Sequence, residues 1–149
     1  MPGGDRGRAQ VQLLGQVAGD QVPGGTETVL VVEDLAAVRD YVAVALRAYG
    51  YRVIPAGTSD EALRICERNH EPIHMVLTDV VMPKLSGPEL VKEIHASNPE
   101  IPCIFMSGFD AQEIAGKGVT DVCGYLRKPF TPETLVRRVR NTLEGHSHG

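Results

Sequence analysis

The sequence predicts a three-layer α/β fold in which a five-stranded parallel sheet carries helices on both faces. Three observations support this prediction. Short apolar runs alternate along the chain with segments whose apolar residues recur at helical spacing. The connections between these segments are short, and glycine, proline or a capping residue marks most boundaries. Strands that alternate with helices in this way form a parallel sheet, because each helix carries the chain back across one face.

The first predicted strand follows residues 1–27, which are rich in Gly, Gln and Pro and are interpreted as a flexible leader or linker. The run TVLVV (28–32) is apolar after its first residue, as expected for a strand covered on both faces. Apolar residues then recur at helical spacing as far as Tyr49, and Gly50 ends the predicted helix. The second predicted strand is YRVIPA (51–56).

The middle of the chain predicts two more helices and two more strands. The segment TSDEALRICERN (58–69) opens with Thr and Glu three positions apart, which is the signature of a capping box. IHMVLTD (73–79) is the third predicted strand, and GPELVKEIHAS (87–97) is the third predicted helix. IPCIFMS (101–107) is the fourth predicted strand.

The last part of the chain completes the pattern. DAQEIAGKG (110–118) predicts only a weak helix because it contains two glycines, and VCGYLR (122–127) predicts the fifth strand. TPETLVRRVRNTL (131–143) predicts the last helix, with Thr131 as N-cap and proline at the first helical position. We therefore expect one domain over residues 28–144, followed by a disordered tail over residues 145–149.

Composition narrows the classes of function. A chain of 149 residues with 42% hydrophobic and 23% charged residues has the size and balance of one globular domain. A net charge of -4 offers no basic field for nucleic acid, and no apolar run approaches the roughly 20 residues that span a bilayer. The N-terminus lacks a secretory signal, and three cysteines in apolar contexts are expected to be reduced, so a cytoplasmic location is predicted.

Polar side chains follow four of the predicted strands. Glu33 and Asp34 follow the first, Asp79 ends the third, Ser107 ends the fourth and Lys128 follows the fifth. The carboxyl ends of parallel strands share one edge of the sheet, where ligands bind in such folds. Three carboxylates repel one another unless a cation is present, and Mg²⁺ prefers carboxylate, water and phosphate oxygens. We therefore expect a Mg²⁺ site in which the lysine holds an anion and an aspartate attacks phosphorus.

Four segments together resemble the receiver domain of two-component response regulators: VLVVEDLAAVRDYV, LTDVVMPKLSGPEL, IPCIFMSG and GYLRKPFTPETL. The resemblance extends from about Thr28 to Leu143, and it implies the (βα)5 flavodoxin-like receiver fold. An acidic pair, D-x-x-M-P, a strand-end serine and K-P are specific in this order, although none of them is specific alone. SGPEL and GYLRKPFTPETL are most similar to receivers attached to hybrid sensor histidine kinases.

The resemblance implies roles for the matching acids. Asp79 matches the phosphoacceptor, and Asp34 matches the acid that binds Mg²⁺ directly. Glu33 matches its partner, which often acts through water. The backbone carbonyl of Val81 is implied as another metal ligand.

Three more positions carry roles implied by the resemblance. Ser107 and Lys128 match the residues that contact the phosphoryl group from two sides. Tyr125 matches an aromatic switch residue, which turns inward once the hydroxyl residue has moved to the phosphate. The peptide bond between Lys128 and Pro129 is implied to be cis.

The expected function is that of a phosphoacceptor module. It takes a phosphoryl group from a sensor histidine kinase or a histidine phosphotransfer protein, promotes its own dephosphorylation, and changes its contacts with a downstream protein. Neither nucleic acid nor direct membrane contact is expected. A stand-alone receiver and the receiver of a hybrid kinase both remain open.

Three other classes of function fit the sequence less well. A haloacid-dehalogenase-type phosphatase also uses an aspartate nucleophile and Mg²⁺, but it needs a second acid two residues later, where Val81 stands. A flavodoxin-like nucleotide binder needs a phosphate-cradling loop after the first strand, and VVEDLAAV offers acids without glycines. A phosphorylation-silent interaction domain is disfavoured because all the reacting positions are intact.

Overall fold

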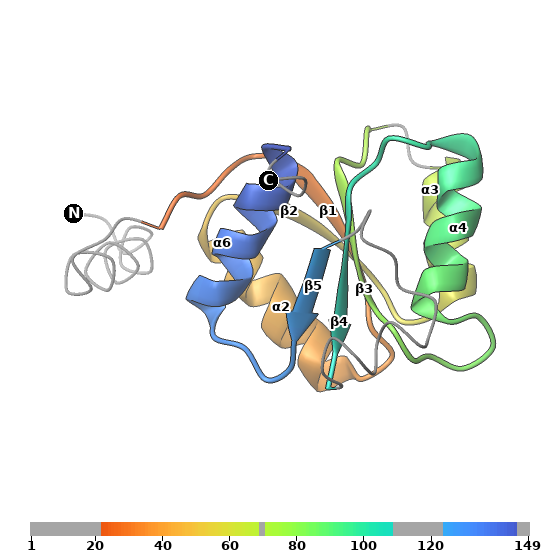
Figure 1. The fold of residues 1–149 in the computed structure, drawn as a ribbon, viewed down its shortest axis with the longest axis horizontal. Coiled ribbons are helices and arrows are strands. Elements are labelled where there is room, and N and C mark those ends of the chain that lie inside the picture. Colours follow the sequence, from red (N-terminus) through yellow and green to blue (C-terminus); the bar gives the residue numbers. More distant parts are fainter. Residues whose placement is uncertain (1–21, 69–70, 109–123, 146–149) are drawn as a thin grey trace.

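One parallel sheet forms the centre of the computed structural model, which describes residues 22–68, 71–108 and 124–145 (Figure 1). Its strands lie in the order β2-β1-β3-β4-β5, and each neighbouring pair is parallel. The strands are β1 (Thr28–Val32), β2 (Arg52–Ala56), β3 (Met75–Asp79), β4 (Cys103–Ser107) and β5 (Gly124–Arg127). The predicted five-stranded α/β fold is confirmed.

Helices cover both faces of the sheet in the described part of the chain: α2 (Ala36–Ala48), α3 (Ser59–Arg68), α4 (Gly87–Ser97) and α6 (Pro132–Leu143). Figure 1 shows α2 and α6 on one side and α3 and α4 on the other. Successive residues of β1 serve opposite faces. Val29 and Val31 join the core under α2 and α6, whereas Leu30 and Val32 join the core under α3 and α4. The continuous apolar run of β1 is thus explained by burial on both faces.

Capping residues mark where two helices begin. Ser86 and Glu89 form a reciprocal capping box at the start of α4. Thr131 caps α6 by accepting a hydrogen bond from the amide of Thr134, and Pro132 stands in the first turn. Thr131 is the N-cap that the sequence predicted for α6, and Ser86 directly precedes the residues predicted for α4.

The other two helices begin differently. Thr58 Oγ1 accepts from the amide of Glu61 at 3.0 Å, but the Glu61 carboxylate accepts from the amide of Gly57 at 2.8 Å. The predicted capping box of α3 is therefore formed in one direction only. Helix α2 has Leu35 at its N-cap position and no side-chain capping bond there.

Residues ahead of β1 also contact the fold. The amide of Gly25 donates to the carbonyl of Tyr49 at 3.2 Å, at the end of α2. Glu27 forms an ion pair with Arg140 of α6 at 2.7 Å. The chain before Thr28 is thus attached to both helices on this face.

Predicted and observed boundaries agree to within one or two residues where both can be compared. The helix expected over residues 110–118 lies outside the described residues, as do most of the expected leader and tail.

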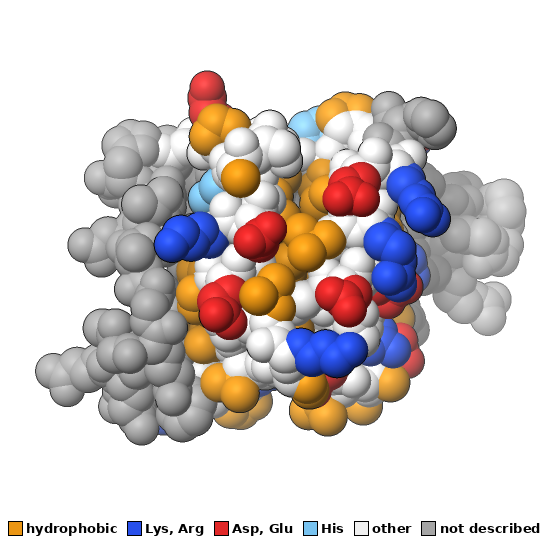
Figure 2. All heavy atoms as spheres, turned by 90° about the vertical axis from the view of Figure 1, so that its right-hand side faces the viewer, with side chains coloured by type: hydrophobic (Ala, Val, Ile, Leu, Met, Phe, Trp, Pro, Cys, Tyr) orange, Lys and Arg blue, Asp and Glu red, His pale blue; other side chains and the backbone are white. Residues whose placement is uncertain are grey.

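The surface over α3 and α4 is mixed in character: hydrophobic side chains gather there between charged side chains of both signs (Figure 2). None of the described helices has the length and apolar content needed to cross a membrane.

The expectation of reduced cysteines is wrong for one position. Cys103 is disulfide-bonded, whereas Cys66 is free. A disulfide requires two Cβ atoms within about 4 Å, and the spacing of cysteines along a sequence does not show which of them meet.

Candidate functional site

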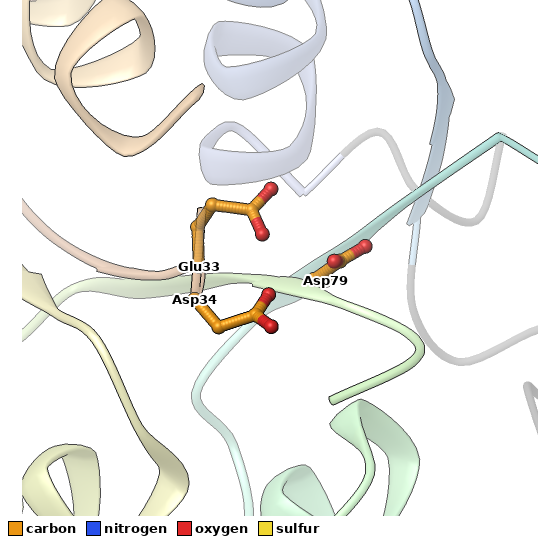
Figure 3. Close-up of side chains that lie close together, drawn as sticks. All are labelled: Glu33, Asp34 and Asp79. Carbon is orange, nitrogen blue, oxygen red and sulfur yellow. The ribbon is translucent and has the colours of Figure 1, made fainter. Parts of the chain in front are cut away.

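Three carboxylates gather at the carboxyl edge of the sheet (Figure 3). Glu33 and Asp34 directly follow β1, and Asp79 is the last residue of β3. One carboxylate oxygen of each lies within 4.8 Å of the others. Figure 3 shows the three side chains reaching toward a common space from two neighbouring strand ends. The structure thus brings together the acids that the sequence placed at separate strand ends.

Strand pairing accounts for this convergence. β1 and β3 are neighbours, and Val32 is paired with Thr78, so the residues that follow them lie side by side. The amide of Val80 donates to Asp79 Oδ1 at 3.1 Å, which orients that carboxylate. Parallel strands end at the same edge, and their first residues beyond the ladder are free to bind a ligand.

The start of α4 also lies against this strand end. The amide of Gly87 donates to the carbonyl of Val80 at 2.8 Å. A Cβ atom at position 87 would lie 2.1 Å from the carbonyl oxygen of Asp79, which is too close for any side chain. Glycine at this position therefore allows α4 to contact the backbone of Asp79.

Lys128 adds a positive charge to the three acids. Its Nζ donates to Glu33 Oε1 at 2.6 Å and lies 3.3 Å from Asp79 Oδ1. Its backbone amide donates to the carbonyl of Ser107 at 2.7 Å, and its peptide bond to Pro129 is cis, as the resemblance implied. One lysine thus connects the ends of β1, β3, β4 and β5.

Burial and charge shift the protonation of this cluster. Desolvation raises the pKa of Glu33 to about 7; the charge of Asp79 adds to this rise, and Lys128 opposes it. Desolvation lowers the pKa of Lys128, but the hydrogen bond to Glu33 and the charges of both acids outweigh it and leave that pKa raised. The ammonium group of Lys128 therefore stays protonated beside the three acids.

The donor set of the cluster fits a hard cation. All three acids offer carboxylate oxygens, which Mg²⁺ prefers over nitrogen or sulfur ligands. A cavity of about 280 Å³ opens beside Asp34, lined in part by Thr58, Met82 and Lys84. Hydrated Mg²⁺ keeps several water ligands, and this opening gives solvent access to the side of the cluster formed by Asp34.

The remaining predicted residues lie around the cluster. Ser107 ends β4, next to β3, and its side chain is buried. Tyr125 lies on β5, half-buried against the core under α3 and α4, and its carbonyl accepts a hydrogen bond from Arg138. The side chain of Val81 is exposed, so only its backbone is suited to the role implied for it.

Sequence reasoning missed one residue at this site. Arg39 of α2 donates from Nη1 to the backbone carbonyl of Glu33 at 2.7 Å. No motif marks this contact, because it depends on the turn between β1 and α2 rather than on residue spacing.

Large hydrophobic side chains are exposed at four positions among the described residues. Leu35 and Val81 lie close in sequence to the acids, and Tyr41 and Val44 lie on α2.

Known proteins resemble this chain over the same region. The family model of the response regulator receiver domain matches residues 29–140. The sensor kinase CckA of Brucella abortus is 40% identical over 121 residues, which are 80% of this chain and 13% of that protein. The probable transcriptional regulatory protein TcrX of Mycobacterium tuberculosis is 32% identical over 121 residues, which are 80% of this chain and 51% of that protein.

Solved structures resemble the fold as well. The receiver domain of the hybrid histidine kinase CckA is 37% identical, with a TM-score of 0.66, over 78% of this chain and 98% of that one. The chemotaxis protein CheY4 of Vibrio cholerae is 28% identical, with a TM-score of 0.72, over 79% of this chain and 99% of that one. The chain therefore spans nearly all of these structures, but only about half or less of the two curated relatives.

Proposed function

This chain belongs to the response regulator receiver family of two-component signalling, and from that premise we propose that Asp79 accepts a phosphoryl group from a phosphohistidine of a partner protein. The observation that carries the proposal is the convergence of Glu33, Asp34 and Lys128 on Asp79. The partner is a sensor histidine kinase or a histidine phosphotransfer protein. We place the chain in the cytoplasm on the same premise.

In the transfer, a carboxylate oxygen of Asp79 forms a bond to phosphorus while the bond from phosphorus to the partner's imidazole nitrogen breaks. The partner keeps the electron pair of that bond and returns to neutral histidine by taking up a proton. Glu33, Asp34, Asp79 and the carbonyl of Val81 would hold Mg²⁺, which when bound would supply positive charge to the phosphoryl group. Catalysis of this kind is mostly positioning and charge neutralisation.

Lys128 and Ser107 complete the contacts with the phosphoryl group. The ammonium group moves from Glu33 toward a phosphoryl oxygen, a short shift because it already lies 3.3 Å from Asp79 Oδ1. The Ser107 hydroxyl donates a hydrogen bond to a second oxygen, and Tyr125 fills the space that the hydroxyl leaves. This rearrangement alters β5 and its surroundings, and thereby the contacts with a downstream protein. The module also promotes hydrolysis of its own phosphate.

The organisation of the chain follows from the same premise. We propose a receiver domain over residues 28–144, preceded by a leader or linker over residues 1–27 and followed by a short tail over residues 145–149. The contacts of Gly25 and Glu27 tie the end of the leader to this domain. The similarity to the receiver of the hybrid kinase CckA supports placement in a hybrid kinase, whereas the similarity to CheY4, of which this chain covers 99%, supports a stand-alone receiver.

Phosphatase activity of the haloacid dehalogenase type is a weaker alternative. Val81, at the place of the required second acid, is 55% exposed and has no group that transfers protons. No other acid joins Glu33, Asp34 and Asp79 in the candidate cluster found in the described part of the chain.

The deciding experiment is intact-protein mass spectrometry after incubation with Mg²⁺ and acetyl phosphate, in parallel with Asp79→Asn. One added phosphoryl group, removed by hydroxylamine and absent from the variant, is the expected result. Asp34→Ala is expected to weaken Mg²⁺ binding and so slow the reaction. The reaction is repeated with a phosphorylated histidine phosphotransfer protein as donor. Absence of an adduct with both donors would contradict the proposal.

A further inference from the structure

The turn between β1 and α2 holds two of the three acids but has little local support. Helix α2 begins with Leu35 at its N-cap position, without a side-chain capping bond, and no acidic residue stands in its first turn. An uncapped helix start leaves amides without partners and gives the preceding residues more freedom. The amide of Leu35 reaches only Glu33 Oε2, at 3.4 Å. Lys128 Nζ holds the Glu33 carboxylate at 2.6 Å, but the backbone that carries Asp34 needs another group to fix its direction.

Arg39 contacts this turn at its central peptide unit. Its Nη1 donates to the carbonyl oxygen of Glu33 at 2.7 Å. That carbonyl belongs to the planar peptide that joins Glu33 to Asp34. Holding this plane restricts ψ of Glu33 and φ of Asp34, and so limits the directions in which the two side chains leave the backbone.

The arginine itself is held from a second side. A Cβ atom at Gly57 would lie 3.1 Å from Arg39 Nη1 and 3.7 Å from Cζ, so the guanidinium packs closely on the backbone of the loop after β2. The amide of Glu33 donates to the carbonyl of Ala56 at 3.1 Å in the same region. Arg39 is half-buried, and its guanidinium presents several N–H donors in a rigid planar group. Its hydrogen bond is therefore partly shielded from water.

On the premise of the proposed function, we infer that Arg39 is a positioning residue for the Mg²⁺ site: its guanidinium locks the peptide between Glu33 and Asp34 so that both carboxylates face Asp79. It touches neither the metal nor the phosphoryl group. Residues that orient metal ligands in this way typically change metal affinity by 10- to 100-fold when removed.

A second arginine on the same helix supplies the matched control. Arg47 Nη2 donates to the backbone carbonyl of Val53 at 3.1 Å, toward the other end of α2. Both arginines thus tie α2 to a strand or strand end through a carbonyl, but only Arg39 reaches the acidic turn. A purely structural role predicts similar effects from replacing either one.

The test compares Arg39→Met, Arg39→Lys and Arg47→Met with the unmutated full chain. Isothermal titration with Mg²⁺ is expected to show affinity weakened about tenfold in Arg39→Met, partly restored in Arg39→Lys and within about twofold of normal in Arg47→Met. In metal-free protein, the NMR amide signals of Asp34 and Leu35 are expected to shift in Arg39→Met and to stay in place in Arg47→Met. Phosphorylation of Arg39→Met is expected to recover at saturating Mg²⁺.

The outcomes separate the two proposals. If the unmutated chain binds Mg²⁺ and Arg39→Met binds it equally well, the positioning role is wrong. If the unmutated chain binds no Mg²⁺, the proposed metal-dependent function is wrong, and the metal-free amide signals alone decide whether Arg39 orders the turn. Should Arg39→Met fail to fold, the Mg²⁺ affinity of Arg39→Lys decides, and an affinity equal to that of the unmutated chain overturns the inference.

Discussion

Lys128 Nζ lies 2.6 Å from Glu33 Oε1, and this contact joins a fully buried carboxylate to the ammonium group that follows β5. Lys128 is therefore the counter-charge of the acids in the metal-free protein. The proposed Mg²⁺ ion needs the same carboxylate, so the lysine and the metal compete for Glu33. Release of the lysine from Glu33 leaves it ready to contact a phosphoryl group on Asp79.

Replacing Lys128 is expected to separate metal binding from phosphorylation. In Lys128→Met, Mg²⁺ binds several-fold more tightly because its competitor for Glu33 is absent. Phosphorylation by acetyl phosphate slows by about 100-fold or more, since removing one preorganised charge at a transition state has effects of this size. Mg²⁺ titration and intact mass over time measure the two effects. Unchanged Mg²⁺ affinity would show that the contact with Glu33 does not oppose the metal.

The raised pKa of Glu33 predicts a pH-dependent metal affinity. With a pKa of about 7 in the metal-free protein, Glu33 is mostly protonated below pH 7 and must lose this proton to bind Mg²⁺. The affinity is expected to fall by up to about tenfold per pH unit below pH 7 and to level off above it. Titrations between pH 5.5 and 8.5 measure this, and Glu33→Gln, which has no such proton, should flatten the profile. A flat profile in the unmutated chain would contradict the prediction.

The same shift predicts how the stability of the metal-free protein changes with pH. Because the folded-state pKa is raised from 4.5 to about 7, the contribution of Glu33 to stability is complete below 4.5 and is lost as the pH rises through 7. Mg²⁺ is expected to reverse this loss, since it favours the carboxylate. Thermal melts with Mg²⁺ and with a chelator measure the difference.

Exposed apolar residues on α2 predict where a protein donor docks. Val44 is 66% exposed, and Tyr41 and Leu35 extend the apolar surface toward the acids. In Val44→Asp, transfer from a phosphorylated histidine phosphotransfer protein is expected to slow about tenfold, the effect of losing roughly 1.4 kcal/mol of contact. Phosphorylation by acetyl phosphate should stay unchanged, because the small donor makes no such contact. Lys92 is exposed on α4, which covers the opposite face of the sheet, and Lys92→Asp is the control variant. Equal transfer rates for the two variants would place the docking surface elsewhere.

The ion pair between Glu27 and Arg140 predicts a contribution to acid stability. The hydrogen bond from Arg140 lowers the pKa of Glu27, so its stabilising effect is present above 4.5 and is lost as the pH falls through the lowered value. Glu27→Gln is expected to destabilise the protein by about 1 kcal/mol at pH 7, and by progressively less in acid. Urea unfolding at several pH values measures this. Glu144 is the more exposed partner of Arg140, so Glu144→Gln should destabilise the protein less than Glu27→Gln. Equal destabilisation by the two variants would contradict the stabilising role assigned to Glu27.

The order of strands and helices along the chain could be predicted from local patterns in the sequence. Periodicity and capping are local signals, so the doubly covered strand TVLVV and the N-cap Thr131 of α6 could be predicted. The sequence also placed Asp79 and Ser107 at the ends of β3 and β4, because a polar residue that closes an apolar run is visible without a structure. Parallel pairing then implies that such ends share one edge of the sheet.

How those strand ends meet depends on the packing of the folded protein. The 2.6 Å contact of Lys128 with Glu33, the raised pKa of Glu33 and the bond from Arg39 to the Glu33 carbonyl depend on burial and on the directions of side chains from different elements. The one-sided cap of α3 and the disulfide of Cys103 were missed for the same reason. Sequence patterns record which face of an element is apolar, whereas distances between polar groups far apart in the chain are set by how the elements pack.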